Sequence, residues 1–195
     1  MKIDFEFISS ILKERKRVSF EDSSLIQAAV LLPVFIKKET PNILFTKRTD
    51  KVEHHKGEIS FPGGMKSDED KDLIETALRE TSEEIGVEAE KIKILGSLDD
   101  MPTVTGFKIT PFVGVLSLPL KMKINEEEIE RIIEVPLPLL MQDAMWSETL
   151  REYRGDMLKT YFFNYNGDII WGATAGILKN FIDILKEHSS RIERE

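Results

Sequence analysis

The alternation of apolar and polar residues along the chain predicts a mixture of helices and strands. Residues 4–17 carry phenylalanine, isoleucine and leucine at spacings of three and four, which predicts an amphipathic N-terminal helix ending in a basic cluster. Residues 173–188 repeat apolar side chains at the same spacing. This second pattern predicts a C-terminal helix packed on something larger.

Between these helices lie runs rich in β-branched and aromatic residues, which are typical of strands. The runs at 28–36 and 43–48 flank the polar segment 37–42, so we expect two strands and a turn. Asn166-Gly167 is the residue pair favoured in a two-residue hairpin turn. Further strands are expected at residues 92–98, 109–118, 132–137 and 159–165. Without regular βαβ alternation, the pattern predicts an α+β fold, an α/β/α sandwich with a mixed sheet between helices.

Length and composition bound the class of protein. The 195 residues suit one domain, and we find no repeat, low-complexity segment or long linker. Hydrophobic residues make up 41% and charged residues 32%, the mixture of a globular protein. The chain has no cysteine, which excludes disulfides, thiolate chemistry and cysteine-bound zinc.

The charge balance narrows the choice of partners. There are 27 Lys and Arg against 35 Asp and Glu, a net charge of −8, which argues against binding to nucleic acid backbones. No apolar run approaches the roughly 20 residues of a membrane span, and the N-terminus lacks a secretory signal pattern, so we expect a cytoplasmic protein. An acidic protein that acts on a polyphosphate would need a cation as mediator.

The segment Ala77–Gly86, ALRETSEEIG, gathers carboxylates on one side of a predicted helix. Glu80, Glu83 and Glu84 stand at i, i+3 and i+4. We expect packing to pin the helix and aim the three carboxylates outward, with Gly86 as the C-terminal stop. The predicted core row of this helix, at spacings of 4, 3 and 4, is Ile74, Leu78, Thr81 and Ile85.

This cluster carries two energetic penalties. Like charges at these spacings destabilise a helix by a few tenths of a kcal/mol per pair, and anions near a helix C-terminus oppose its dipole. Arg79 can reach back to Glu75 or forward to Glu83, but one guanidinium cannot neutralise the cluster. A hard divalent cation with oxygen ligands explains the pattern, and a solvated acidic face is the alternative.

The segment before the helix favours the metal interpretation. Pro62-Gly63-Gly64 lets the backbone bend sharply and approach a ligand closely, although a plain strand-to-loop turn is the alternative. Residues 63–87 resemble the signature of the Nudix hydrolases, whose second half is matched at every fixed position from Arg79 to Val87. The first half departs: Arg79 comes one residue late, and the spacer acid is Asp70 rather than Glu.

The lengthened spacer resembles a subfamily of coenzyme A pyrophosphatases. Segments 44–48 and 55–64 resemble its upstream motif, and coverage runs from about Ala28 to the final helix. The resemblance implies a single Nudix domain over 1–195, with the helix at 4–17 as an extension and a core at about 28–188. Phe45, Thr49 and Glu53 depart from the residues usual in the part associated with coenzyme A.

The resemblance implies a reaction and roles for residues. Water would cleave the pyrophosphate bond of a nucleoside diphosphate derivative, most simply coenzyme A, to 3′,5′-ADP and 4′-phosphopantetheine. Glu80, Glu83 and Glu84 would bind Mg²⁺ or Mn²⁺ with the carbonyl of Gly63, Glu80 and Glu84 counting also as catalytic. Arg79 would orient the glutamates, unless it forms an ordinary surface ion pair.

A later acidic loop is the expected source of the general base. Residues 124–132 offer Glu126, Glu127 and Glu128; we favour Glu128, then Glu127, against the alternative of a solvated loop.

One basic cluster near the signature could contact the substrate phosphates. It consists of Arg48, His54, His55 and Lys56, of which His54 could instead face solvent. Trp171 and Phe107 could stack on a base or pack the core.

Other functions stay in view. A hydrolase of ADP-ribose or of oxidised nucleoside triphosphates is the nearest alternative, and a nucleotide-sensing module is the non-enzymatic one. A prenyl diphosphate isomerase of this architecture would want a catalytic cysteine, which is missing. The partner is expected to be a small nucleotide, and whether the N-terminal helix caps a homodimer stays open.

Overall fold

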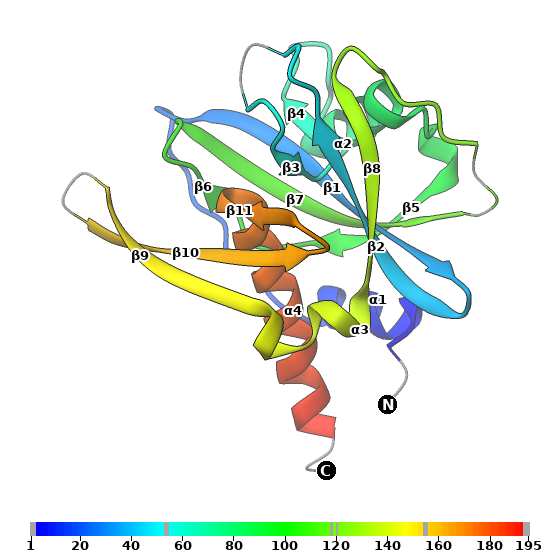
Figure 1. Cartoon of the computed structure of the whole chain (residues 1–195), viewed down its shortest axis with the longest axis vertical. Coiled ribbons are helices and arrows are strands. Elements are labelled where there is room, and N and C mark those ends of the chain that lie inside the picture. Colours follow the sequence, from blue (N-terminus) through cyan, green and yellow to red (C-terminus); the bar gives the residue numbers. More distant parts are fainter. Residues whose placement is uncertain (1–2, 53–54, 118, 120, 154–155, 193–195) are drawn as a thin grey trace.

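The computed structural model describes residues 3–52, 55–117, 119, 121–153 and 156–192. Two sheets and the helices around them form the molecule (Figure 1). The main sheet contains the strands β1 (Ile26–Lys37), β2 (Thr40–Arg48), β3 (Ile59–Ser60), β4 (Gly63–Met65), β5 (Ile92–Ser97), β6 (Met101–Pro102), β7 (Phe107–Leu116) and β8 (Ile129–Pro136). The second sheet contains β9 (Trp146–Tyr153), β10 (Asp156–Tyr165) and β11 (Asp168–Trp171). The mixed α+β class and the sandwich are confirmed.

The main sheet is mixed because its two long central strands run in parallel. β1 pairs in parallel with β7 over nine residue pairs, from Ile26 with Phe107 to Val34 with Val115. The remaining pairs are antiparallel, including β2 with β1 and β8, and β5 with β7. The short strands β3 and β4 pair with β2 and β1 respectively, so the segment around Gly63 lies between the two strands where they separate.

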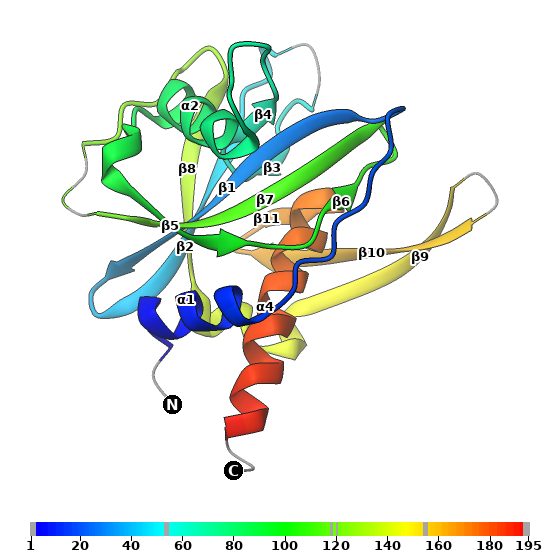
Figure 2. The ribbon, with the colours of Figure 1, turned by 180° about the vertical axis from the view of Figure 1, so that it is seen from behind.

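Helices cover both faces of this sheet. Figures 1 and 2 show α2 (Leu73–Ile85) on one side and α1 (Phe5–Glu14) with α4 (Gly172–Ile192) on the other. Two apolar clusters correspond to these two layers: Leu44 and Ala77 belong to the α2 side, and Phe45 and Phe181 to the side of α1 and α4. The remaining elements are α3 (Leu137–Leu140) and two short 3₁₀ helices, Ala89–Lys91 and Asp143–Met145.

Several expected boundaries move. The N-terminal helix ends at Glu14 rather than residue 17, and the turn between β1 and β2 contains only Lys38 and Glu39 rather than six residues. Both turn residues have positive φ angles, 48° and 64°, as a tight hairpin requires. The strand β9 was not predicted, because its polar residues hide the pattern of a strand.

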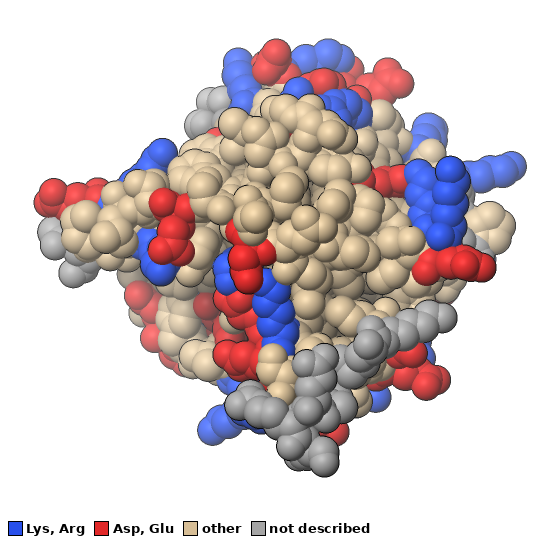
Figure 3. All heavy atoms as spheres, turned by 60° about the horizontal axis from the view of Figure 1, so that its bottom comes forward, with Lys and Arg blue, Asp and Glu red and all other residues tan. Residues whose placement is uncertain are grey.

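Charged side chains are unevenly distributed over the surface. In Figure 3, charged side chains gather mainly around the rim of the lower face, and its centre is largely uncharged. No helix in the described part of the chain is long and apolar enough to cross a membrane.

Candidate active site

The helix α2 has the local signals that its sequence predicts. Asp72 caps the N-terminus by accepting a hydrogen bond from the backbone N–H of Glu75, and Gly86 ends the helix in a left-handed conformation with φ 68°. The predicted core row is only partly correct, since Ile74 is exposed. Two residues outside that row, Thr76 and Ala77, are fully buried instead.

The three glutamates do not share one environment. Glu83 is exposed and Glu80 is half-buried, whereas Glu84 is only 2% exposed. The expectation that all three carboxylates point outward is therefore wrong for Glu84. The reason is tertiary: the backbone N–H of Asn125 bonds to the carbonyl oxygen of Glu84 at 2.9 Å, and that of Lys123 to the carbonyl oxygen of Ile85 at 3.0 Å. The loop between β7 and β8 therefore covers this end of the helix.

Burial changes the protonation of Glu84. Loss of hydration, together with the negative charges of Glu80 and Glu128, raises the pKa of Glu84 to about 8. The positive charge of Arg48, 3.9 Å away, and a hydrogen bond from the backbone N–H of Gly63 act in the opposite direction and lower the pKa of Glu84. The Oε2 atom of Glu84 is buried and has no hydrogen-bond partner. A buried acceptor without a partner is costly, so this atom suits a ligand that the protein binds.

Arg79 holds the other two glutamates. Its Nη1 atom donates to Glu80 at 2.8 Å and to Glu83 at 3.1 Å, which confirms that it reaches forward to Glu83. It does not reach back to Glu75, whose carboxylate accepts from the backbone N–H of Lys71. Arg79 instead binds Asp70 through two parallel hydrogen bonds, Nε to Oδ1 at 2.9 Å and Nη2 to Oδ2 at 3.1 Å.

Asp70 is the site residue whose contribution the sequence pattern did not reveal. Its buried carboxylate also accepts hydrogen bonds from the backbone N–H of Ser67 and the hydroxyl of Thr76. The hydrogen bonds from Arg79 hold the pKa of Asp70 far below its usual range and raise the pKa of the Arg79 guanidinium. The signal that could have identified it is its place as the acidic residue of the spacer, nine residues before Arg79.

We expect Asp70→Asn to destabilise the protein by about 3 kcal/mol, because an amide NH₂ would face the guanidinium in a buried site. Asp70 has a depressed pKa, so its contribution is present above about pH 4 and is lost as the pH falls through the lower folded-state value. Urea unfolding at pH 7 and at pH 3 measures both effects.

The matched control for this change is Asp68→Asn. Asp68 lies in the same loop with an exposed side chain, and its substitution should change stability by less than about 0.5 kcal/mol. Equal losses in the two variants would contradict a special contribution from Asp70.

Glycine allows the backbone to approach the glutamates. A Cβ atom on Gly64 would lie 2.5 Å from the carboxyl carbon of Glu80 and 2.6 Å from each of its oxygens. On Gly63, with φ 154°, a Cβ atom would lie 2.4 Å from the carbonyl oxygen of Ala29. The Pro-Gly-Gly segment is therefore more than a turn: it seats Glu80 directly over β4.

The loop between β7 and β8 brings Glu128 to the cluster. Glu128 lies close enough to raise the pKa of both Glu80 and Glu84, and its side chain accepts a hydrogen bond from Asn125 at 3.1 Å. Glu127 turns outward and pairs with Lys51 at 2.9 Å. Thr49, which directly follows β2, donates its backbone N–H to the carbonyl oxygen of Glu128 and its hydroxyl to that of Glu127. One of the three residues that depart from the coenzyme A pyrophosphatase pattern therefore ties this loop to the end of β2.

The predicted basic cluster divides into separate environments. Arg48 faces Glu84 across 3.9 Å. His55 is exposed and pairs with Glu58 at 2.9 Å, and Lys56 is exposed beside a groove formed with β10 and β11. His54 and Glu53 lie outside the described residues. Phe45 belongs to the core, where its ring stacks on Phe61 with centroids 4.9 Å apart.

A divalent cation fits the donor set of this site. Within the described ranges, no group of three or more His, Asp or Glu side chains is arranged to hold a metal ion. Arg79 holds Glu80 and Glu83 as ion pairs. The unpartnered Oε2 of Glu84 and the neighbouring carboxylates of Glu80 and Glu128 are hard oxygen donors of the kind that Mg²⁺ and Mn²⁺ take. Whether the carbonyl of Gly63 joins them stays a prediction.

Comparison with known proteins places the chain in a family. Residues 25–152 match the NUDIX domain. An uncharacterized Nudix hydrolase named NudL from Citrobacter koseri is 33% identical over 174 residues, which cover 89% of this chain and 90% of that protein. A protein of the same name from Photorhabdus laumondii is 37% identical over 151 residues, covering 77% and 80%.

Solved structures share the fold at low sequence identity. A MutT/nudix family protein from Enterococcus faecalis has a TM-score of 0.55 at 16% identity, covering 93% of this chain and 69% of that one. The Ap4A hydrolase of C. elegans, solved as a binary complex, has a TM-score of 0.52 at 13% identity, covering 88% and 100%.

Proposed function

The chain belongs to the Nudix hydrolase family and is a pyrophosphohydrolase of nucleoside diphosphate derivatives, and on this premise we propose that it cleaves coenzyme A or its acyl derivatives. The products are 3′,5′-ADP and 4′-phosphopantetheine or its acyl form. The lengthened spacer between Gly64 and Arg79 and the upstream residues 44–48 and 55–64 support this substrate, because they resemble the coenzyme A pyrophosphatase pattern.

The observation that carries the hydrolytic assignment is the buried carboxylate of Glu84, whose Oε2 atom has no partner, beside Glu80 and Glu128. Glu80, Glu83 and Glu84 would hold Mg²⁺ or Mn²⁺, which neutralises phosphate charge and makes a water molecule more acidic. Arg79, fixed by Asp70, keeps Glu80 and Glu83 at the site. Gly64 leaves room for Glu80 against the backbone.

Glu128 is the proposed general base. A water molecule attacks one phosphorus atom, the bond from that phosphorus to the bridging oxygen breaks, and the bridging oxygen leaves with the other phosphate. Glu128 takes the proton of the attacking water. Arg48, which lies beside Glu84, offers positive charge to the phosphate oxygens.

A substrate panel tests the proposed substrate. We expect release of 3′,5′-ADP from coenzyme A with Mg²⁺ or Mn²⁺, at a kcat/KM at least about tenfold above that for ADP-ribose or nucleoside triphosphates. Chelation of the metal by EDTA should abolish the release. A higher kcat/KM for ADP-ribose would replace coenzyme A by the alternative substrate and leave the family assignment intact.

The pair Glu128→Gln and Glu127→Gln separates the proposed base from its neighbour. We expect Glu128→Gln to lower kcat by about a hundredfold or more, because the base can no longer accept a proton. Glu127→Gln should leave kcat within about twofold, since its carboxylate pairs with Lys51 at the surface. Equal rates in both variants, measured by product release at saturating substrate, would remove Glu128 from the reaction.

A further inference from the structure

A groove of about 640 Å³ lies between the second sheet and the end of β2. One wall is a face of the second sheet, to which Arg151, Phe162, Ile169 and Trp171 belong. The other wall is formed by Lys47 and residues 56–59. Neither the reaction nor the metal site uses the residues of the second sheet.

The aromatic residues of this groove are available to a ligand. Trp171 is 37% exposed, so the alternative from the sequence analysis, that it packs the core, is wrong. The other tryptophan, Trp146, packs on Phe163 and donates its indole N–H to the carbonyl oxygen of Leu140. The Arg151 guanidinium lies 5.6 Å from the ring centroid of Phe162 and 5.9 Å from that of Trp171. Rings whose faces already attract a planar cation are suited to stack on a planar base.

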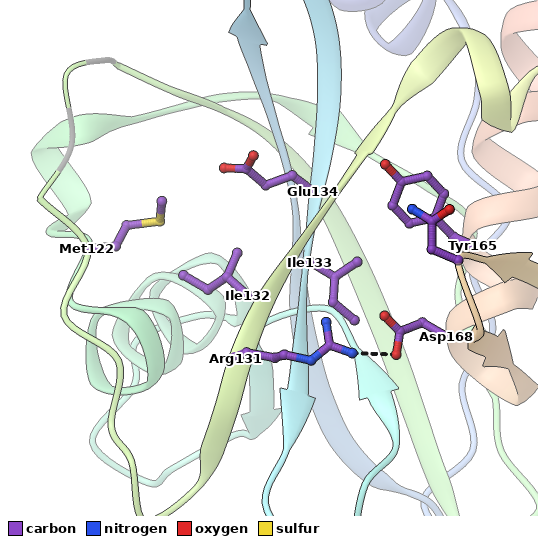
Figure 4. A pocket seen from close by; sticks show the side chains of 8 residues that line it. Met122, Arg131, Ile132, Ile133, Glu134, Tyr165 and Asp168 are labelled. Atoms are coloured by element: carbon purple, nitrogen blue, oxygen red, sulfur yellow. Dashed lines mark hydrogen bonds and ion pairs between the residues drawn. The ribbon is translucent and has the colours of Figure 1, made fainter.

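The charges of the groove favour an anion. Its acids are engaged elsewhere: Glu58 pairs with His55, and Asp168 pairs with Arg131 at 2.5 Å (Figure 4). Lys47 pairs with Glu130 at 3.2 Å. Lys56 and Arg151 form no ion pair with any residue in the part of the chain that the structure describes. Two available cations beside an exposed indole match a ring that carries phosphate.

A second hollow helps to show what is particular to this groove. It has a volume of about 410 Å³, lies beside β8 and includes the Arg131–Asp168 pair in its lining (Figure 4). Its charged residues are paired, Arg131 with Asp168 and Glu134 with Lys37, and its apolar lining is aliphatic apart from Tyr165. It offers neither available charge nor an exposed indole.

The groove and the proposed active site involve consecutive residues at the end of β2. Lys47 lines the groove, and the next residue, Arg48, faces Glu84. The backbone N–H of Arg48 also bonds to the carbonyl oxygen of Glu58, in the same wall of the groove as Lys47, at 2.9 Å. A substrate whose pyrophosphate lies at Arg48 can therefore extend around the end of β2 into the groove.

We propose that this groove binds the nucleotide end of the substrate, with the base on Trp171 and the nucleotide phosphates at Lys56 and Arg151. This assignment rests on the proposed function, because it supplies the specificity of the same site. The base takes the place of the exposed Arg151 guanidinium over the indole, and Arg151 turns to the phosphate. Phe162 supports the indole on the strand beside it, as the cross-strand pair of Trp171.

Binding of adenosine 3′,5′-bisphosphate in EDTA tests the groove without hydrolysis. In the wild type we expect quenching of tryptophan fluorescence, and ribose 5-phosphate, which has no base, should cause none. Trp171→Ala should raise the Kd from calorimetry about tenfold, as loss of a stacked base does. The remaining emission, from Trp146, should no longer respond to the nucleotide and reports whether the core is intact.

Charge variants test the anion contacts. Lys56→Gln and Arg151→Gln should each weaken adenosine 3′,5′-bisphosphate about threefold to tenfold and have little effect on adenosine. The matched controls lie on the opposite face of the same sheet: Lys159→Gln, whose ammonium pairs with Glu148, and the exposed Leu150→Ala should bind like the wild type.

The outcomes separate this proposal from the proposed function. A wild type that hydrolyses coenzyme A, with KM unchanged within twofold in Trp171→Ala, overturns the groove and leaves the hydrolase. Quenching that depends on Trp171, in a protein that hydrolyses no pyrophosphate tested, supports the groove and overturns the proposed function. Absence of nucleotide binding to the wild type at millimolar concentration also overturns the groove.

Discussion

Glu84→Gln is expected to lower kcat/KM by about a hundredfold or more while leaving the metal-free protein at least as stable as the wild type at pH 8. The two effects have one cause. Glu84 is buried, its Oε2 has no partner, and Glu80 and Glu128 lie near it, so its charged form is costly until a cation arrives. Glutamine keeps the shape of the side chain and removes the charge.

The pH dependence of stability follows from the direction of the shift. Folding raises the pKa of Glu84 from 4.5 to about 8, so the folded protein holds a proton that the unfolded chain has released between these values. The stability of the metal-free wild type relative to Glu84→Gln should therefore be highest below pH 4.5. We expect it to decline by roughly 3–5 kcal/mol as the pH rises to 8.

Metal binding should reverse this decline, because a cation displaces the proton from Glu84. Below pH 8, the apparent affinity for Mn²⁺ should increase about tenfold for each unit by which the pH rises. Calorimetry measures this affinity, and repeating it in buffers of different ionisation enthalpy measures the release of the proton. Glu90→Gln, at an exposed position just beyond the helix, is the matched control and should behave as wild type. Parallel stability curves for wild type and Glu84→Gln from pH 4.5 to 8 would show that Glu84 is not the buried acid.

Alanine substitutions at the adjacent glycines Gly63 and Gly64 should have different effects, the first on stability and the second on activity. Gly63→Ala is expected to destabilise the protein by about 3 kcal/mol or more, because the new Cβ atom would meet the backbone of β1, 2.4 Å from the carbonyl oxygen of Ala29. A backbone strand in the main sheet cannot move aside at low cost. Thermal unfolding of the metal-free protein measures the loss.

Gly64→Ala should instead leave stability within about 1 kcal/mol and reduce kcat about tenfold or more. The three atoms nearest to its Cβ atom are the carboxyl carbon and the two oxygens of Glu80, at 2.5–2.6 Å, and that flexible side chain can turn away. A displaced Glu80 no longer lies beside Glu84, so metal affinity should fall with activity. Gly64→Ala with wild-type activity would mean that Glu80 does not need its place over β4.

Much of the fold is readable from local patterns. The helix α2 has a cap at Asp72, an apolar row and a stop at Gly86, and these signals act within a few residues of each other. Strands β1, β2, β7 and β10 carry runs of β-branched or aromatic residues. The turn at Asn166-Gly167 forms as predicted, with φ angles of 53° and 91°. Strand β9 escapes prediction because Ser147, Glu148 and Thr149 interrupt any apolar pattern, and its pairing with β10 supplies the strand.

The sequence by itself determined the helix, its glutamates, the glycine pair and the family, because propensity, capping and motif spacing are local properties of a chain. Tertiary structure decided which glutamate is buried, which acid holds Arg79 and which tryptophan is exposed. Glu84 is covered by a loop about 40 residues further along, and Trp171 and Lys56 line one groove only because the second sheet folds against the main sheet. Such contacts depend on the relative placement of distant segments, and burial and charge at the site follow from that placement.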